Sequence, residues 1–141
     1  MATTRSANAH WEGSLAEGSG KVSLDSSNLG AFDVTWASRA EEPNGRTSPE
    51  ELIAAAHSSC FNMALSNVLA KSGNPPQALD TRADVDFVPG TGITEIRITV
   101  RGQVEGMSNV DFVAAAEDAK VNCPVSGALA ATPIKLDAAL A

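Results

Sequence analysis

Two cysteines are the residues of this chain best suited to redox chemistry. Cys60 and Cys123 are its only cysteines, and they lie far apart in the sequence. Two thiols can be oxidised to a disulfide and reduced again, and the thiolate is the nucleophile in these reactions. A lone cysteine in a helix is usually a small buried apolar residue. Here ionisable residues occur where they could activate one, so we treat the pair as candidate redox residues.

A buried cysteine becomes reactive only with a positively charged neighbour. Burial raises the pKa of a thiol above its usual value of about 8.5, and a guanidinium about 4 Å away offsets this by up to ~4 kcal/mol. Arg39 is the best candidate because it directly follows an apolar segment, although a solvated loop arginine is the more common case. Glu50 is free to orient that arginine, since Glu51 occupies the capping-box position after Ser48.

His57 precedes Cys60 by three residues, which places both on one face of a helix. A histidine there could be a base or a metal ligand, but among alanines it is more often packed and hydrogen-bonded. We expect a supporting residue. A zinc site from His10, His57, Cys60 and Cys123 has the right number of ligands. No CxxC or HxxxH spacing supports that site, so no metal is predicted.

A long helix must position Cys60. Ser48 is a good N-cap, Pro49 suits the first helical position, and the apolar residues 52–69 continue until Gly73 and two prolines end the run. Small or apolar side chains occupy nearly every face of this segment. We therefore expect the helix to be central and buried.

The remaining pattern predicts short strands, a polar loop and further helices. Cys123 is expected at the N-cap of a short helix that starts at Pro124. The predicted strands are 10–15, 21–25, 32–36, 79–88, 92–104 and 134–140, with a loop at 39–46 and a helix at 112–121. This order predicts one α+β domain over residues 1–141.

Composition excludes several classes of partner. A net charge of -7 argues against nucleic acid, which needs a concentrated positive surface, and against anionic membrane surfaces. No apolar run is expected to reach the ~20 residues that span a bilayer, and residues 1–8 lack the apolar stretch of a secretory signal. We therefore expect a cytoplasmic protein, in a compartment where two cysteines are seldom a structural disulfide.

Two motifs around the cysteines resemble one known family. Residues 47–61, TSPEELIAAAHSSCF, and residues 122–126, NCPVS, are similar to the OsmC/Ohr family, the osmotically inducible and organic-hydroperoxide-resistance proteins. HWEG at 10–13 and ADV at 83–85 also resemble it, so the similarity runs nearly from end to end. The Ohr branch carries an arginine in its first glycine-rich turn. That turn reads EGSG here, at residues 17–20, which indicates the OsmC branch.

The resemblance implies a fold and an assembly. It implies an intertwined homodimer in which antiparallel sheets wrap around two long central helices, with two active sites at the interface. It also implies Cys60 as the peroxidatic cysteine and Cys123 as the resolving one, with Arg39 and Glu50 as the activating pair.

The implied activity is a thiol-dependent peroxidase. Cys60 would reduce an organic hydroperoxide, or hydrogen peroxide, to an alcohol or water and become a sulfenic acid. Condensation with Cys123 would give a disulfide, which an external thiol or dithiol would reduce without a cofactor. We expect Ile53, Phe61 and Met63 to contact the substrate. The alternatives are a non-enzymatic redox or small-ligand-binding domain that uses the same pocket, and then a metal-binding protein.

Overall fold

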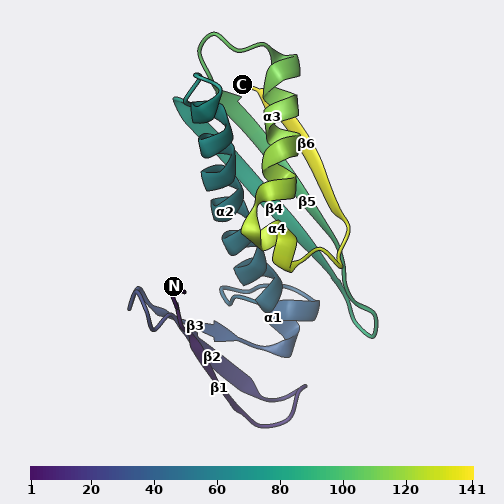
Figure 1. The fold of residues 1–141 in the computed structure, drawn as a ribbon. Coiled ribbons are helices and arrows are strands. Elements are labelled where there is room, and N and C mark those ends of the chain that lie inside the picture. The colour runs from purple at the N-terminus through teal and green to yellow at the C-terminus, as the bar shows by residue number, and fades with distance from the viewer. The chain divides into compact units, whose positions relative to one another are not determined.

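Groups of strands and groups of helices follow one another along the chain, which a computed structural model describes over residues 1–141 (Figure 1). The predicted α+β class is confirmed. The chain divides into two compact units, Met1–Leu52 and Ile53–Ala141. The elements in chain order are β1 (Asn8–Glu12), β2 (Ser19–Ser23), β3 (Ala31–Val34), α1 (Trp36–Ala40), α2 (Pro49–Lys71), β4 (Ala78–Val88), β5 (Gly92–Gln103), α3 (Asn109–Asn122), α4 (Pro124–Ala128) and β6 (Ile134–Leu140).

The first unit contains an antiparallel sheet in the order β1-β2-β3. All three strands were predicted, but each one begins and ends a little earlier than expected. Gly13 has a φ of +92°, which favours glycine, and so the chain turns directly after β1. Every residue of β1 is exposed. None of the fully buried apolar side chains of the protein comes from this unit, so its sheet has no apolar core of its own.

Helix α1 lies where the sequence pattern predicted a strand up to residue 36 and a loop from Arg39, and that prediction is wrong. Thr35 and Ser38 end the strand by forming a reciprocal cap: each side chain accepts a hydrogen bond from the backbone N–H of the other, both at 3.0 Å. These bonds satisfy donors at the start of a helix. As a result Arg39 lies in the last turn of a short helix.

The second unit contains the sheet β4-β5-β6. Strands β4 and β5 are antiparallel, as predicted, but β6 runs parallel to β5, from Ile96 opposite Ile134 to Gly102 opposite Leu140. The expectation of purely antiparallel sheets is therefore wrong for this sheet. The connection through α3 and α4 returns the chain to the starting end of β5, and a helical crossover of this kind produces parallel strands.

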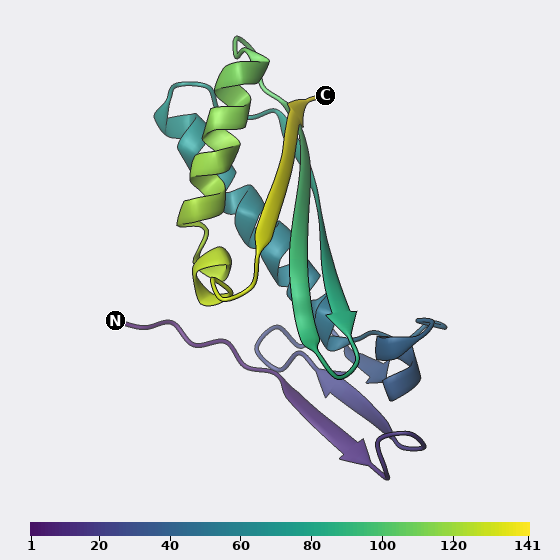
Figure 2. The same cartoon turned by 90° about the vertical axis from the view of Figure 1, so that its right-hand side faces the viewer.

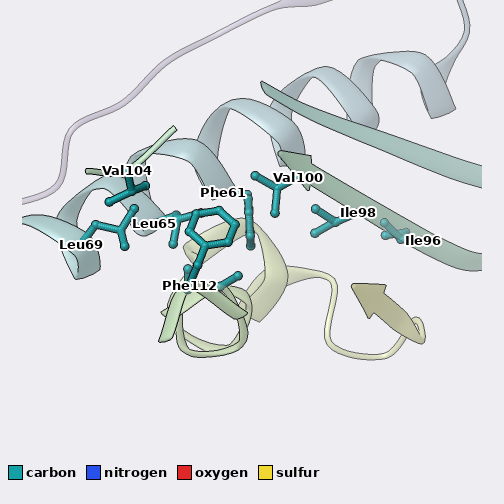
Figure 3. Close-up of a cluster of buried hydrophobic side chains, with 10 residues drawn as sticks. Phe61, Leu65, Leu69, Ile96, Ile98, Val100, Val104 and Phe112 are labelled. Carbon is teal, nitrogen blue, oxygen red and sulfur yellow. The ribbon is translucent and has the colours of Figure 1, made fainter. Parts of the chain in front are cut away.

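Helix α3 and the part of α2 from Ile53 onward cover one face of this sheet (Figure 2). The core lies between them and is built from alternate residues of β5 and one face of each helix (Figure 3). Gly102 is required in β5, because a Cβ atom there would lie 2.6 Å from the ring of Phe112. The buried apolar residues are Phe61, Leu65, Leu69, Ile96, Ile98, Val100, Val104, Phe112, Ala116 and Ala119.

Helix α2 begins at Pro49, as predicted, and buries only one face. The Ser48 hydroxyl accepts from the backbone N–H of Glu51 at 3.2 Å, but the Glu51 carboxylate accepts from the Thr47 hydroxyl at 2.6 Å rather than completing the expected capping box. Buried residues recur every fourth position, at His57, Phe61, Leu65 and Leu69. The prediction of burial on nearly all faces is wrong within one chain, because the chain supplies cover for one face alone.

The composition of α2 bears on the expectation that no apolar run is long enough to span a bilayer. Its 23 residues meet the length and the apolar composition of a membrane span, and 22% of its most apolar stretch is buried. The core helix of a soluble protein has the same properties, so this finding alone does not indicate a membrane protein. It does show that most of this stretch is left uncovered by the chain itself.

Candidate functional site

The two cysteines meet at one point of the second unit. Cys60 lies in the middle of α2, and Cys123 lies between α3 and α4 as the last cap of one helix and the N-cap of the next. Their sulfur atoms are 3.2 Å apart and both are thiols. This separation is within hydrogen-bond range of sulfur, and a small movement would bring the two atoms to the bonding distance of a disulfide. The pair can therefore cycle between thiols and a disulfide without unfolding.

Their environments make the two thiols unequal. Burial raises the pKa of Cys60, and the adjacent Cys123 raises it further, against a lowering by the backbone N–H of Val125. Burial also opposes ionisation of Cys123. Hydrogen bonds from the Ser126 backbone, Cys60, the Ser126 hydroxyl and the Val125 backbone nevertheless bring the pKa of Cys123 below the usual value. Within one chain, the surroundings therefore raise the pKa of Cys60 and lower the pKa of Cys123.

Access to solvent favours the opposite cysteine. Cys123 is only 1% exposed, whereas Cys60 is half-buried and lies on the wall of an open groove. The groove has a volume of about 840 Å³ and runs along α2 beside α3 and the start of α4. It is lined by Cys60, Met63, Ala64, Asn67, Val68, Lys71, Ser72, Asp118, Asn122 and Pro124. A small molecule in this groove would reach the sulfur of Cys60 first.

His57 lies one turn before Cys60 and is fully buried. Its Nε2 atom is 2.8 Å from the hydroxyl of Ser126 on α4, and its Nδ1 atom has no hydrogen-bond partner. Burial lowers the pKa of His57, so the imidazole is neutral at neutral pH. The sequence indicated a packed, hydrogen-bonded histidine, and the structure places it in that environment.

Arg39 and Glu50 come together in the first unit. The guanidinium donates from Nε at 3.0 and 3.2 Å and from Nη2 at 2.9 Å to the two carboxylate oxygens, in a bidentate pair. The side chain of Glu50 is 8% exposed and that of Arg39 is 32% exposed. A bidentate, partly buried pair of this kind fixes the plane of the guanidinium, so Arg39 is held in one orientation with part of its surface open.

The residues predicted to contact a substrate are placed differently from one another. Met63 lines the groove beside Cys60 and is 73% exposed. Phe61 is fully buried in the apolar core, on the other side of the helix. Ile53 is half-buried and is not among the residues that line the groove.

Sequence reasoning missed Ser126 and the polar rim of the groove. Ser126 is three residues after Cys123, the spacing at which N-cap and N3 residues of a helix interact, and this spacing was the available signal. Lys71, Asp118 and Asn122 carried no such signal, because their position on the groove follows from the packing of α3 beside α2. No cluster of three or more His, Cys, Asp or Glu side chains is arranged to hold a metal ion.

Comparisons with known proteins agree with this arrangement. Residues 42–138 match the family described as OsmC-like protein. The protein named peroxiredoxin OsmC from Escherichia coli strain K12 is 40% identical over 134 residues, which are 93% of this chain and 93% of that protein. A protein of the same name from Shigella flexneri matches with the same identity and coverage.

Solved structures share the fold at lower identity. An organic hydroperoxide resistance protein from Elizabethkingia anophelis superposes with a TM-score of 0.73 at 23% identity, and the match covers 100% of both chains. A protein from Legionella pneumophila, described as the organic hydroperoxide resistance protein OsmC, gives a TM-score of 0.70 at 22% identity over 97% of each chain. These structures establish the fold, and the matches in sequence establish the kinship. The chain therefore belongs to the OsmC family.

Proposed function

We propose that this protein is a thiol-dependent peroxidase that reduces organic hydroperoxides, and also hydrogen peroxide, through Cys60 and Cys123. The observation that carries the proposal is the 3.2 Å contact between the two sulfurs, one of which opens onto a groove. The names of the relatives, peroxiredoxin and organic hydroperoxide resistance protein, support the same activity.

The proposed reaction has three steps. The Cys60 thiolate attacks the peroxide oxygen, the O–O bond breaks, and the alkoxide leaves as an alcohol or, from hydrogen peroxide, as water. The resulting Cys60 sulfenic acid condenses with Cys123 to a disulfide and releases water. An external thiol or dithiol then restores both thiols by exchange. Sulfur carries the whole redox change, so the proposed reaction uses no metal or organic cofactor.

The first step requires an activator that raises the thiolate fraction of Cys60. Within the chain, burial and Cys123 raise the pKa of Cys60, and the Val125 backbone lowers it. The net result is a raised pKa. We assign the activation to Arg39, oriented by Glu50. A guanidinium close to the sulfur would favour the thiolate, and the bidentate pair holds Arg39 ready for that contact. Met63, on the groove wall next to Cys60, is the proposed substrate contact with the clearest access.

The working form is proposed to be a soluble cytoplasmic homodimer, with residues 1–141 of each chain acting as one peroxidase domain. Helix α2 leaves an apolar face uncovered, and the first unit has a sheet without an apolar core. A second copy of the chain would cover the open face of α2 and the sheet of the first unit, and by symmetry the first copy would do the same for the second. Two α2 helices at the centre, with the sheets around them, would then form the intertwined arrangement.

A homodimer has direct consequences for mass and stability. Sedimentation of the reduced protein at micromolar concentration should give twice the chain mass of 14.5 kDa, because burial of the open face of α2 stabilises the folded chain. Ala55→Glu places a charge on that face and should give monomer or unfolded protein. Ala114→Glu, at an exposed alanine on α3, is the matched control. A folded, active monomer of the unmodified chain would contradict this assembly.

The activity itself is tested by peroxide consumption with and without a reductant. With dithiothreitol the protein should reduce cumene hydroperoxide over many turnovers. Without it, about one equivalent per chain should be consumed, because a single pair of thiols supplies two electrons. The oxidised protein should then run as a single chain on a non-reducing denaturing gel, with a Cys60–Cys123 disulfide in its peptide map.

The other outcomes identify the alternatives. Oxidation of the cysteines without repeated turnover under any dithiol would indicate a non-enzymatic redox or ligand-binding domain. Disulfide-linked dimers on the same gel would show that the disulfide forms between chains. A stoichiometric metal in elemental analysis of the purified protein would point to the metal-binding alternative.

A further inference from the structure

A chain of three buried polar groups joins α2 to Cys123. His57, Ser126 and Cys123 are 0%, 6% and 1% exposed. The His57 Nε2 atom lies 2.8 Å from the Ser126 hydroxyl oxygen. Ser126 is the third residue of α4, whose N-cap is Cys123, and its side chain is one of the groups that lower the pKa of the Cys123 thiol. The peroxidase reaction as proposed above uses neither His57 nor Ser126. Buried polar side chains next to a reactive sulfur call for a functional explanation.

The unpaired nitrogen of His57 fixes the direction of these hydrogen bonds. Burial keeps the imidazole neutral, so one ring nitrogen carries hydrogen and the other accepts. A buried N–H without an acceptor is costly, and Nδ1 has no partner. The hydrogen is therefore on Nε2, and it is donated to the Ser126 oxygen. The Ser126 hydroxyl then keeps its own hydrogen for donation, and a donor aimed at the Cys123 sulfur favours the anion, in agreement with the lowering of the Cys123 pKa by this side chain.

We infer that His57 and Ser126 are positioning residues that hold Cys123 as a thiolate, both when it attacks the oxidised Cys60 and when it leaves from the disulfide. This inference rests on the proposed function, and it assigns to this His57–Ser126 relay the second and third steps of that reaction. His57 acts only through Ser126. The interaction is directional, so loss of either residue of the relay should raise the pKa of Cys123.

Cys123 carries the negative charge at the start of the second step and again in the third step, when the disulfide breaks. In the second step the Cys123 thiolate attacks the Cys60 sulfur, the S–S bond forms, and the S–O bond of the sulfenic acid breaks to release hydroxide, which takes up a proton. In the third step a thiolate of an external dithiol attacks Cys60, the sulfur that faces the groove. The Cys60–Cys123 bond breaks with its electron pair on Cys123. The second thiol of the dithiol then displaces Cys60 as thiolate.

A stabilised Cys123 anion speeds the third step, because a thiol of lower pKa is the better leaving group. Few other groups near this sulfur titrate or carry charge. Helix α2 contributes the Cys60 thiol and His57, with Lys71 further along the groove. Helix α3 contributes Asp118. From α4 come the uncharged donors of Val125 and Ser126. Of these side chains, only Cys60 and Ser126 lower the pKa of Cys123.

The first test measures the ionisation of Cys123 in a Cys60→Ser background, which leaves one thiol. The chain contains no tyrosine, so the ultraviolet absorbance of the thiolate can be followed without interference from phenolate. Ser126→Ala and His57→Phe should each raise the pKa of Cys123 enough to leave about tenfold less thiolate near neutral pH. Ser126→Thr and His57→Gln keep a donor and should restore most of the effect.

Matched controls come from the same residue types elsewhere. Ser59→Ala removes a hydroxyl that bonds only to its own helix, and His10→Phe removes the exposed second histidine. Neither should move the pKa of Cys123. An unchanged pKa in folded Ser126→Ala protein would overturn the inference.

A second test keeps the inference falsifiable if the variants fail to fold. The chain has two histidines, so long-range proton–nitrogen NMR of the unmodified protein can separate His57 from His10. The expected tautomer carries hydrogen on Nε2; hydrogen on Nδ1 would reverse the relay and reject it. Reduction by dithiothreitol of the disulfide preformed with diamide should slow in Ser126→Ala. None of these measurements uses a peroxide, so they succeed or fail independently of the peroxidase activity.

Discussion

Cys60→Ser should lower peroxide consumption to the uncatalysed background. A serine hydroxyl at this position lacks the thiolate that attacks a peroxide oxygen, and no second thiol opens onto the groove. Ser59→Ala, at the neighbouring residue whose hydroxyl bonds to its own helix, is the matched control and should retain activity. Circular dichroism and sedimentation would show that both variants remain folded and assembled.

Cys123→Ser should behave differently from Cys60→Ser. It should consume about one equivalent of peroxide and stop, with a sulfenic acid accumulating at Cys60 because no resolving thiol remains. Dimedone labelling followed by mass spectrometry locates that acid. An adduct found mainly on Cys123 in the unmodified protein would exchange the two roles.

This experiment matters because acidity and access point to different cysteines. Within one chain the pKa of Cys60 is raised by burial and by Cys123, while hydrogen bonds lower the pKa of Cys123. Cys123 is nevertheless 1% exposed, and only Cys60 of the two lines the groove. The ionisation of a thiol matters for this reaction only if a peroxide can reach its sulfur. Access therefore supports the proposed role of Cys60 as the peroxidatic cysteine, and this proposal requires a further group that lowers the pKa of Cys60.

The elements around the site could be predicted where local signals are strong. The Ser48 cap, the apolar run and the terminal glycine defined α2, and Pro124 correctly placed Cys123 at a helix start. Helix α1 was missed because its cap uses Thr35 and Ser38, an uncommon pairing in place of the usual acidic residue. The direction of β6 was missed as well, since its sequence alternates in the same way whether it pairs parallel or antiparallel.

The site itself depends on contacts that no local pattern encodes. Residue type and position made Cys60 and Cys123 candidates, and the family resemblance added Arg39 and Glu50 as the activating pair. The structure brings these four residues together as two separate pairs. Ser126 could not be selected, because its importance comes from lying opposite His57 on another helix. The burial of α2 was overestimated for a related reason. An apolar surface in a sequence does not tell which chain will cover it.

Glu50, which orients Arg39, is separated along α2 from the cysteine that this pair is proposed to activate. Glu50 and Cys60 belong to the same continuous helix, α2, and ten residues of helix rise about 15 Å along the axis. A glutamate side chain cannot bridge that distance, and Arg39 binds Glu50 through both Nε and Nη2. A partner helix that runs antiparallel would bring its own first turn close to this Cys60. We therefore predict that Arg39 and Glu50 serve the Cys60 of the partner.

A mixed dimer tests this prediction with a large expected effect. Arg39→Ala and Cys60→Ser chains, co-expressed with different tags and purified through both, should give about half the activity of the unmodified dimer, since one of two equivalent sites is complete. Each parent homodimer should be nearly inactive. Arg46→Ala, which removes an exposed loop arginine of the same unit, is the matched control and should leave the homodimer active.

The reciprocal mixed dimer makes the result independent of how well the variants fold. It joins an unmodified chain to one that carries both Arg39→Ala and Cys60→Ser, so the same two substitutions are present in a different arrangement. If Arg39 acts across the interface, the intact Cys60 now meets the altered Arg39 of its partner, and this dimer should be nearly inactive. If Arg39 acts within its own chain, the unmodified chain keeps a complete site, and the order of the two activities is inverted. Equal activity of the two mixed dimers would mean that Arg39 is not the activator at all, which would leave the chemistry of the cysteine pair in place but remove the proposed source of the Cys60 thiolate.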